Sequence, residues 1–379
     1  MNSDSAPLLR TPLYDSHVAA GGRMVPFAGW EMPIQYHSVI AEVKAVRSDV
    51  GIFDVSHMGR LNIYGSGAAS FMDSLVTFSV KTLATGRARY GFILSDSGGI
   101  LDDVILYHTQ FDDGSDLLRL VCNASNRLAV IGWMDQNAAT FPGVTFNDHT
   151  YETALIAIQG PRALEVVDGL CIGDPGPSAL RPFAADTFPF ALGDGVRAEG
   201  FVGRTGYTGE DGVEIAIDAA HAPRLWEALT AAGAVPCGLG ARDVLRLEAG
   251  LRLHGSDIDL TTTPLEAALE RFVNMDKNIF HGRDALELQE EDGLRRRLVG
   301  FRLLGGGVPR HGCAVLHEGH AIGEVTSGTY SPILDTGIAM GYVPADHTAP
   351  GQSVQIDLRG RLVEAEVSEL PFYRRPKTS

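Results

Sequence analysis

The chain has 379 residues and a formal net charge of −16, with 45% hydrophobic and 21% charged residues. This length predicts two or three domains with a sizeable core. The acidic balance argues against nucleic-acid binding, which needs a basic face, and no apolar run approaches the ~20 residues that a membrane span requires.

Cysteines and histidines are too scattered to form a recognisable framework. The four cysteines lie far apart without a CxxC pair, and the twelve histidines include no HExxH or HxH pair. The pattern therefore predicts neither a disulfide scaffold nor a metal site. Residues 1–10 lack the basic start and apolar run of a signal peptide. Together these features predict a soluble, cytoplasmic protein without a metal.

Helical and strand patterns alternate as far as residue 272, which predicts mixed α and β structure. The expected helices, in chain order, are 40–50, a segment after Asn123 to about 136, 161–170, 222–232, 239–249 and 264–272. The expected strands in the same region are 60–64, 89–94, 100–107, 117–122 and 153–158. Asn123 is a candidate N-cap for the helix that follows it. A Pro- and Gly-rich connection covers residues 173–182.

The sequence pattern changes beyond about Arg296, where short β runs are separated by Gly and Pro. These runs are 298–303, 314–316, 321–325, 338–343, 354–358 and 363–367. Their spacing predicts a small antiparallel barrel or a sandwich. The acidic-then-basic stretch 290–297 is expected to be a solvated junction. The predicted division is therefore 1–285 and 296–374.

The segment Gly206–Glu214, with the sequence GYTGEDGVE, is the most informative feature of the chain. Its Asp-Gly pair favours the positive φ of a sharp turn, and the alternation of Ile215 and Ile217 predicts a strand after it. The turn delivers Glu214 to the start of that strand, where a carboxylate can meet the N–H groups of a ligand. A hairpin with solvated acids is the alternative that this pattern leaves open.

Asp102 and Asp103 interrupt a run of strand-forming apolar residues that follows Gly98-Gly99. Neighbours on a strand point to opposite faces, so the two carboxylates cannot both enter one pocket. Burying a carboxylate is costly, which favours a functional explanation. The alternative is that both lie at the exposed beginning of the strand, and the pattern alone does not choose between the two residues.

Two groups of basic residues each allow two interpretations from the sequence. Arg242 and Arg246 share one face of the expected helix, which makes sense if an anion lies between or above them. An exposed helix with partners elsewhere explains the same pattern. The segment 371–375 (PFYRR) is either a solvated tail or a basic clamp.

Taken together, these segments resemble the aminomethyltransferases, the tetrahydrofolate-dependent T-proteins of the glycine cleavage system. The matching segments run in order along nearly the whole chain: 11–15, 26–30, 53–58, 98–103, 206–214, 241–250, 255–259 and 339–343. The resemblance implies an α+β fold, a three-domain cloverleaf-like ring with a central folate site. It also implies that 1–285 holds two interleaved α+β domains that bind folate, and that 296–374 is an antiparallel β-barrel.

The resemblance also implies a reaction. The lipoyl arm of the H-protein brings an aminomethyl group, and tetrahydrofolate takes its carbon as 5,10-methylenetetrahydrofolate, with release of ammonia and dihydrolipoyl H-protein. The family's catalytic aspartate falls on Asp103, which is expected to hold the pterin and influence its protonation. A carboxylate in a largely apolar pocket is more basic than in water, which suits that role.

Further residues carry over from the family by position. Pterin contacts fall on Met58, Tyr90, Asn123, Tyr207 and Glu214. Arg242, Tyr373 and Arg374 are expected toward the glutamate tail or the lipoyl entrance. Glu214 would accept hydrogen bonds from the pterin's amino and ring N–H groups.

Two other functions remain to be weighed. One is a folate-dependent demethylase of a small amine or a sulfonium compound, although the amine-oxidising relatives carry a flavin domain for which this chain has no room. The other is a non-catalytic folate-binding scaffold. Relatives of that kind carry a Lys-Gly-Cys-Tyr-x-Gly-Gln-Glu segment, whereas the corresponding residues 246–259 contain no cysteine.

Overall fold

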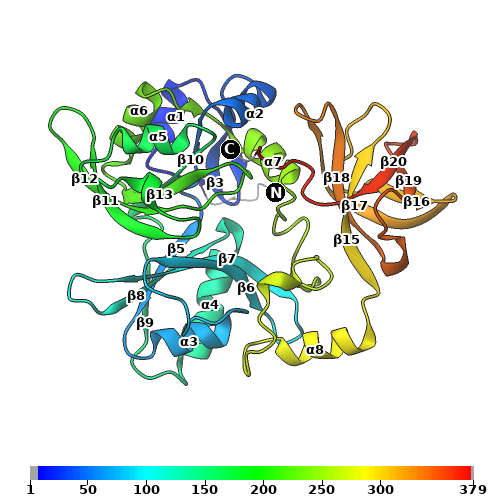
Figure 1. The fold of residues 1–379 in the computed structure, drawn as a ribbon, viewed down its shortest axis with the longest axis horizontal. Coiled ribbons are helices and arrows are strands. Elements are labelled where there is room, and N and C mark those ends of the chain that lie inside the picture. The colour runs from blue at the N-terminus through cyan, green and yellow to red at the C-terminus, as the bar shows by residue number, and fades with distance from the viewer. Residues whose placement is uncertain (1–6, 377–379) are drawn as a thin grey trace.

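Three bodies of secondary structure make up the computed structural model, which describes residues 7–376 (Figure 1). Two of them are built on a six-stranded and a five-stranded sheet, and the third is a closed six-stranded barrel. Helix α7 (Leu239–Glu248) lies between the first body and the barrel (Figure 1). The predicted α+β class with a C-terminal antiparallel barrel is confirmed.

The six-stranded sheet has the strand order β11-β12-β13-β10-β4-β14. Its strands are β4 (Gly51–Asp54), β10 (Thr153–Gln159), β11 (Ala185–Ala191), β12 (Arg197–Gly203), β13 (Gly212–Asp218) and β14 (Val235–Pro236). Helices α1 (Tyr14–Ala19), α2 (Val39–Ser48), α5 (Ala163–Asp168) and α6 (Ala222–Ala231) belong to the same body. Central strand β10 is buried on both faces, because Ile156 and Ile158 pack into one apolar cluster and Leu155 and Ala157 into another.

The five-stranded sheet has the order β6-β7-β8-β5-β9. Its strands are β5 (Gly59–Tyr64), β6 (Arg87–Leu94), β7 (Ile100–Gln110), β8 (Asp116–Cys122) and β9 (Thr145–Asp148). Helices α3 (Ala68–Leu75) and α4 (Arg127–Ala138) cover one face, where they pack on Val104 and Leu106 of β7. Because side chains alternate along a strand, the odd-numbered residues of β7 face the other way. This alternation decides which aspartate can reach the centre of the molecule.

The barrel closes in the order β15-β18-β17-β16-β19-β20, with every pair antiparallel. Its strands are β15 (Arg296–Leu303), β16 (Ala314–His317), β17 (His320–Ser331), β18 (Thr336–Pro344), β19 (Ser353–Asp357) and β20 (Leu362–Ser368). Each predicted run corresponds to one strand, and the barrel rather than the sandwich is realised. Helix α8 (Arg283–Asp292) precedes the barrel. The junction after it is only partly solvated, since Arg296 and Arg297 pair with Glu266 and Glu270.

A smaller three-stranded sheet joins β1 (Leu9–Arg10), β3 (Trp30–Gln35) and β2 (Arg23–Phe27) in that order. Short 3-10 turns fill several connections: η1 (Ala124–Asn126), η2 (Pro177–Ala179), η3 (Glu270–Phe272) and η4 (Ala345–His347). Residues 173–182 form a connection as predicted. Cys122, Cys171, Cys237 and Cys313 are free thiols. Within residues 7–376, no helix has the length and apolar character needed to cross a membrane.

Two local predictions were wrong, and a third was right except for its bounds. Residues 264–272 form turns that end in η3, because Ala268 adopts a left-handed φ of 57° and the Arg252 guanidinium binds the Ala267 carbonyl that a helix would use. The helix expected over 161–170 is the shorter α5. Asn123 makes no capping bond with its side chain, which binds aspartates instead.

Candidate active site

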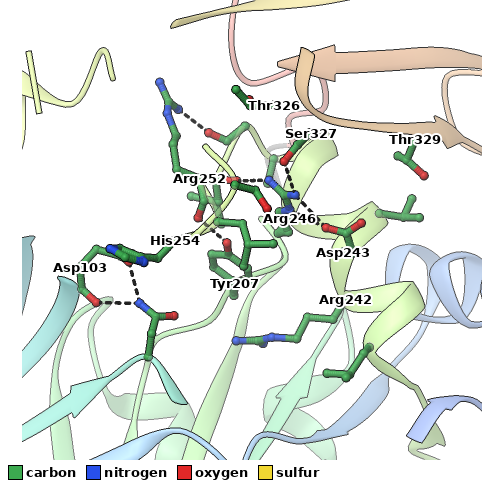
Figure 2. Close-up of a pocket in the computed structure, with 18 of the residues that line it drawn as sticks. Asp103, Tyr207, Arg242, Asp243, Arg246, Arg252, His254, Thr326, Ser327 and Thr329 are labelled. Atoms are coloured by element: carbon green, nitrogen blue, oxygen red, sulfur yellow. Dashed lines mark hydrogen bonds and ion pairs between the residues drawn. The ribbon is translucent and has the colours of Figure 1, made fainter. Parts of the chain in front are cut away.

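A cavity of about 1440 Å³ lies where the bodies meet (Figure 2). The β2–β3 hairpin, strands β6, β7 and β13, helix α7 and barrel strand β17 all contribute to its wall. Seven of the nine residues expected at the site border it: Met58, Tyr90, Asp103, Asn123, Tyr207, Glu214 and Arg242. Segments far apart in sequence therefore converge on one cavity.

Asp103 presents its carboxylate to this cavity from β7. Tyr90 donates its hydroxyl to Oδ2 at 3.0 Å, and Asn123 donates Nδ2 to Oδ1 at 2.7 Å. Burial raises the pKa of the Asp103 carboxyl, while the nearby His254 and these two hydrogen bonds act in the opposite direction. The raised pKa brings proton uptake closer to neutral pH, so the group is suited to exchanging a proton with a ligand.

Asp102 points to the opposite face of β7 and does not border the cavity. Its side chain is fully buried and accepts hydrogen bonds from Asn123 and Asn126. The expectation that only one of the two carboxylates enters the pocket is confirmed. The alternative that both lie at an exposed strand end is wrong, because the β6–β7 connection is packed against residues 259–262.

The Gly206–Glu214 turn has the predicted form, with φ of +79° at Gly209 and +156° at Gly212. Glu214 follows on β13, and Thr205 donates its hydroxyl to Oε2 at 2.6 Å. Within the described chain, the other carboxylate oxygen of Glu214 accepts no hydrogen bond from the protein. Both remaining acids of the turn are ion-paired: Glu210 binds Arg47 with its side chain buried, and the partly exposed Asp211 binds Arg204.

Arg242 and Arg246 do not share an anion. Arg246 is held by Asp257 at 2.6 Å and by Asp243 at 2.8 Å, so its charge is already compensated. Arg242 instead lies over the ring of Tyr207, with Cζ 4.7 Å from the ring centroid. Its Nη1 is buried and has no hydrogen-bond partner among residues 7–376. Figure 2 draws contacts for Arg246 and none for Arg242. Arg242 is therefore the member of the pair with an N–H available to a ligand.

His57 is a cavity residue that the sequence analysis did not single out. It is 3% exposed, its ring meets Phe27 edge-on at 5.5 Å, and its Nδ1 is buried without a partner in the described structure. Burial lowers its pKa to about 4, helped by the charges of Arg242 and Arg60. The imidazole is therefore neutral at pH 7. Its neighbour Met58 packs against the apolar cluster beneath α7.

Other cavity residues were also missed. His254 faces Asp103 and hydrogen-bonds the Ile100 carbonyl at 3.1 Å, and Phe272 meets the Tyr90 ring at 4.8 Å. His57 lies inside the matched segment 53–58, which was the available signal. His254 lies in irregular chain after α7, where no local pattern indicates a direction. Phe272 ends the 3-10 turn η3 in a segment for which a helix was predicted, so the direction of its side chain could not be inferred.

Tyr373 and Arg374 lie outside the cavity wall. The Tyr373 ring packs under the Arg47 guanidinium, 4.0 Å from Cζ, and its backbone N–H binds the Glu248 carbonyl. Arg374 is exposed. The chain borders the cavity only up to Pro371, and Tyr373 then lies beside the end of α7.

Two buried nitrogen atoms without protein partners, Nδ1 of His57 and Nη1 of Arg242, border the same cavity. Buried polar groups are usually satisfied, so such atoms indicate a place where a ligand supplies the missing partners. Glu214 and Asp103 add carboxylates that accept N–H groups. Among residues 7–376, no group of three or more His, Cys, Asp or Glu side chains is arranged to hold a metal ion.

Comparisons with known proteins agree with this arrangement. Residues 13–277 match the family model described as GCVT N-terminal domain, and residues 296–374 match the glycine cleavage T-protein C-terminal barrel domain. An aminomethyltransferase of Picosynechococcus sp. is 43% identical over 371 residues, covering 98% of this chain and 99% of the relative. That of Moorella thermoacetica is 42% identical over 376 residues, covering 98% and 100%.

Among solved structures, the glycine cleavage system aminomethyltransferase T of Bartonella henselae superimposes with a TM-score of 0.87 at 34% identity. The match covers 97% of this chain and 99% of that structure. Both family models and the full-length relatives therefore cover the sheets that build the cavity as well as the barrel. The chain belongs to the aminomethyltransferases, the T-protein family of the glycine cleavage system.

Proposed function

We propose that this chain transfers the one-carbon unit of an aminomethyl group on the lipoyl arm of H-protein to tetrahydrofolate. The products are 5,10-methylenetetrahydrofolate, ammonia and dihydrolipoyl H-protein. The observation that carries the proposal is the position of Asp103, whose carboxylate borders the same cavity as Glu214 and Arg242. Full-length relatives named aminomethyltransferase support it independently.

The size of the cavity fits a two-substrate reaction. Small-molecule pockets usually measure about 300–1,000 Å³. At about 1440 Å³, this cavity has room for a folate and for the end of a lipoyl arm that meets it there. Bringing the two reactants together in one cavity supplies much of the rate, and excluding water during the transfer prevents loss of the carbon as formaldehyde.

The reaction redistributes two protons. The carbon loses its bonds to sulfur and to the amine nitrogen and gains bonds to N5 and N10 of the folate. The two protons that leave N5 and N10 end on ammonia and on the lipoyl thiol. Asp103 is the group proposed to hold a proton next to the folate, since burial raises its pKa toward neutrality.

The other cavity residues are proposed to bind and orient the folate. Glu214 has one carboxylate oxygen bound by Thr205 and the other available for the amino and ring N–H groups of a pterin. Tyr207 and Met58 provide apolar wall, with Tyr207 fixed by the hydrogen bond from its hydroxyl to the Arg252 carbonyl. Arg242 offers an unpartnered N–H to an acceptor oxygen. The proposed setting is the cytoplasm, in keeping with the four free thiols.

The two alternative functions are not favoured. The relatives matched over 98% of the chain are named aminomethyltransferases, not demethylases. A binding scaffold has no need of a carboxyl that is buried at a cost and directed at the ligand. Asp103, bonded by Tyr90 and Asn123 in the cavity wall, is such a group.

The test is a turnover assay with tetrahydrofolate and aminomethylated H-protein, with dimethylglycine and a sulfonium compound as competing donors. The wild-type chain should release ammonia only with the loaded H-protein. Asp103→Asn should lose about 100-fold or more in kcat while still binding folate, because proton transfer is typically worth about 10²–10⁴-fold. Asp116→Asn, an exposed change on the same sheet, is the matched control. Near-normal turnover by Asp103→Asn would remove Asp103 from the chemistry.

A further inference from the structure

The polar cluster behind the Asp103 carboxylate, formed by Asp102, Asn123 and Asn126, has no part in the chemistry proposed so far. Asp102 is fully buried on the α4 side of β7, one residue from Asp103 but on the opposite face of the sheet. Burying a carboxylate there is costly unless it is bonded. The role inferred below for Asp102 rests on the proposed function.

Each oxygen of Asp102 meets only N–H donors. Oδ2 accepts the backbone N–H of Asn123 at 2.9 Å, and Oδ1 accepts Nδ2 of Asn123 at 2.9 Å and Nδ2 of Asn126 at 2.7 Å. An ionised carboxylate is acceptor-only and can satisfy all of these donors at once. Asp102 therefore fixes both the backbone and the side chain of Asn123.

The Asn123 amide connects the two faces of the sheet. Its Nδ2 lies 2.9 Å from Oδ1 of Asp102 and 2.7 Å from Oδ1 of Asp103. Reversing the amide would turn its oxygen toward both carboxylates, which is repulsive. Asp102 and the main-chain carbonyl of Asp103, which lies 3.2 Å from Nδ2, together keep the donor side of Asn123 toward Asp103. The second oxygen of the Asp103 carboxylate is held by Tyr90. With both oxygens bound, the Asp103 carboxylate has one defined orientation toward the cavity.

We propose that Asp102 is a positioning residue for the one-carbon transfer: by holding the Asn123 amide from behind the sheet, it orients the Asp103 carboxylate. Asp102 has no contact with the cavity, so its effect on the reaction is transmitted through Asn123. The cost of burying its charge is offset by the alignment it imposes, since small displacements of a reacting group lower rates steeply.

The two carboxyl groups also interact electrostatically. Burial and the nearby Asp103 raise the pKa of Asp102, as expected for two carboxyls that share one amide donor. The other titratable groups that face this pair are Tyr90 from β6, Cys122 from β8, Tyr207 from the β12–β13 turn and His254 from the segment after α7. Burial, rather than the charge of Asp102, is what raises the pKa of Asp103, so replacing Asp102 is expected to act through the orientation of Asp103.

The experiment compares the full-length wild type with Asp102→Asn, using tetrahydrofolate and aminomethylated H-protein. An asparagine at 102 cannot accept from all three donors, so the Asn123 amide is held less firmly and keeps only its contacts with Asp103. We expect kcat to fall about 10- to 100-fold, with the Kd for tetrahydrofolate changing less than about threefold. A purely structural role for Asp102 would weaken tetrahydrofolate binding and lower the melting temperature together with kcat, and that result would overturn the proposal.

Asn126→Ala is the second variant and keeps both carboxylates. It removes one donor to Asp102 and leaves Asn123 in place, so kcat should fall in the same direction but by less. If Asp102→Asn does not fold, a wild-type kcat in Asn126→Ala overturns the proposal. Asp116→Asn removes an exposed carboxylate from the same sheet and should leave kcat unchanged. Failure of the wild type itself to turn over would instead contradict the proposed function.

Discussion

Arg242 brings a cation into the cavity wall with no carboxylate bound to it. Its nearest compensation is the ring of Tyr207 and the field of Glu214, and burial lowers its pKa. A buried charge of this kind is costly to the free protein and is retained where a ligand repays that cost. Arg242 is therefore expected to contribute to binding at the expense of stability.

Replacing Arg242 by Met separates these two effects. The variant should have a melting temperature equal to or above that of the wild type without folate. Its Kd for tetrahydrofolate should rise about 10- to 100-fold, because a hydrogen bond to a charged group is worth about 1.5–3 kcal/mol. Calorimetry and thermal unfolding measure the two quantities. Arg224→Met, at a half-exposed position on α6, is the control, and an unchanged Kd in Arg242→Met would contradict the assignment.

His57 predicts a pH dependence of stability. Its folded-state pKa is lowered to about 4 by burial, against about 6.5 in the unfolded chain. Between these values the unfolded state binds the extra proton, so the stability contributed by neutral His57 is present above about pH 6.5 and is lost as pH falls toward 4. The loss amounts to about 3 kcal/mol at the acid end.

The variant that isolates this contribution is His57→Leu, which removes an imidazole with no protein partner at Nδ1. Its free energy of unfolding in urea should fall less steeply with acidification than that of the wild type. The same replacement at exposed His320 should keep the wild-type slope. Parallel pH curves for wild type and His57→Leu would show that His57 does not titrate on unfolding.

At the scale of elements, the start of β7 positions Asp103 through a close backbone approach. A Cβ on Gly99 would lie 1.9 Å from the Leu260 carbonyl oxygen, and the next residue, Ile100, donates its N–H to the carbonyls of Asp259 and Thr262. Because backbone atoms cannot move aside as a flexible side chain does, only glycine fits at position 99. The β6–β7 connection is thereby fixed against residues 259–262.

Gly99→Ala should therefore destabilise the protein by about 2 kcal/mol or more and displace the strand that carries Asp103. Thermal unfolding and kcat should both fall. Gly132→Ala is the matched control, since a Cβ on this α4 glycine meets nothing within 4 Å. It should be neutral or raise stability by up to about 1 kcal/mol, as alanine favours helix. Equal effects of the two substitutions would contradict the packing argument.

Sequence reasoning succeeded where a local pattern carries the information. Alternation along β7 separated Asp102 from Asp103, and the Asp-Gly turn placed Glu214 correctly. It failed where residues distant in the sequence determine the local structure. Residues 264–272 have a helical composition, but the Arg252 guanidinium occupies the Ala267 carbonyl. Asn123 is of a residue type that often caps helices, but its side chain binds carboxylates on the neighbouring strand.

At the scale of the molecule, the contact between α7 and the barrel joins two parts of the cavity wall. Arg246 of α7 donates to the hydroxyl of Ser327 on β17 at 2.7 Å, and the hydroxyl of Ser331 donates to Glu248 at 2.6 Å. All four side chains are buried. Leu247 packs beside them against Leu298, Ile338 and Met340 of the barrel. No local pattern predicted this junction, because its two sides are about 80 residues apart.

A double substitution of the serines tests whether this junction holds the cavity together. Ser327→Ala with Ser331→Ala leaves buried charged groups on α7 with fewer partners, each at a cost of about 1–3 kcal/mol. Amide hydrogen exchange should become faster in α7 and β17 while the five-stranded sheet stays protected, and kcat/KM should fall. Ser353→Ala, at the exposed start of β19, is the control. Unchanged exchange in α7 would mean that apolar packing around Leu247, rather than these polar contacts, docks the barrel onto the rest of the molecule.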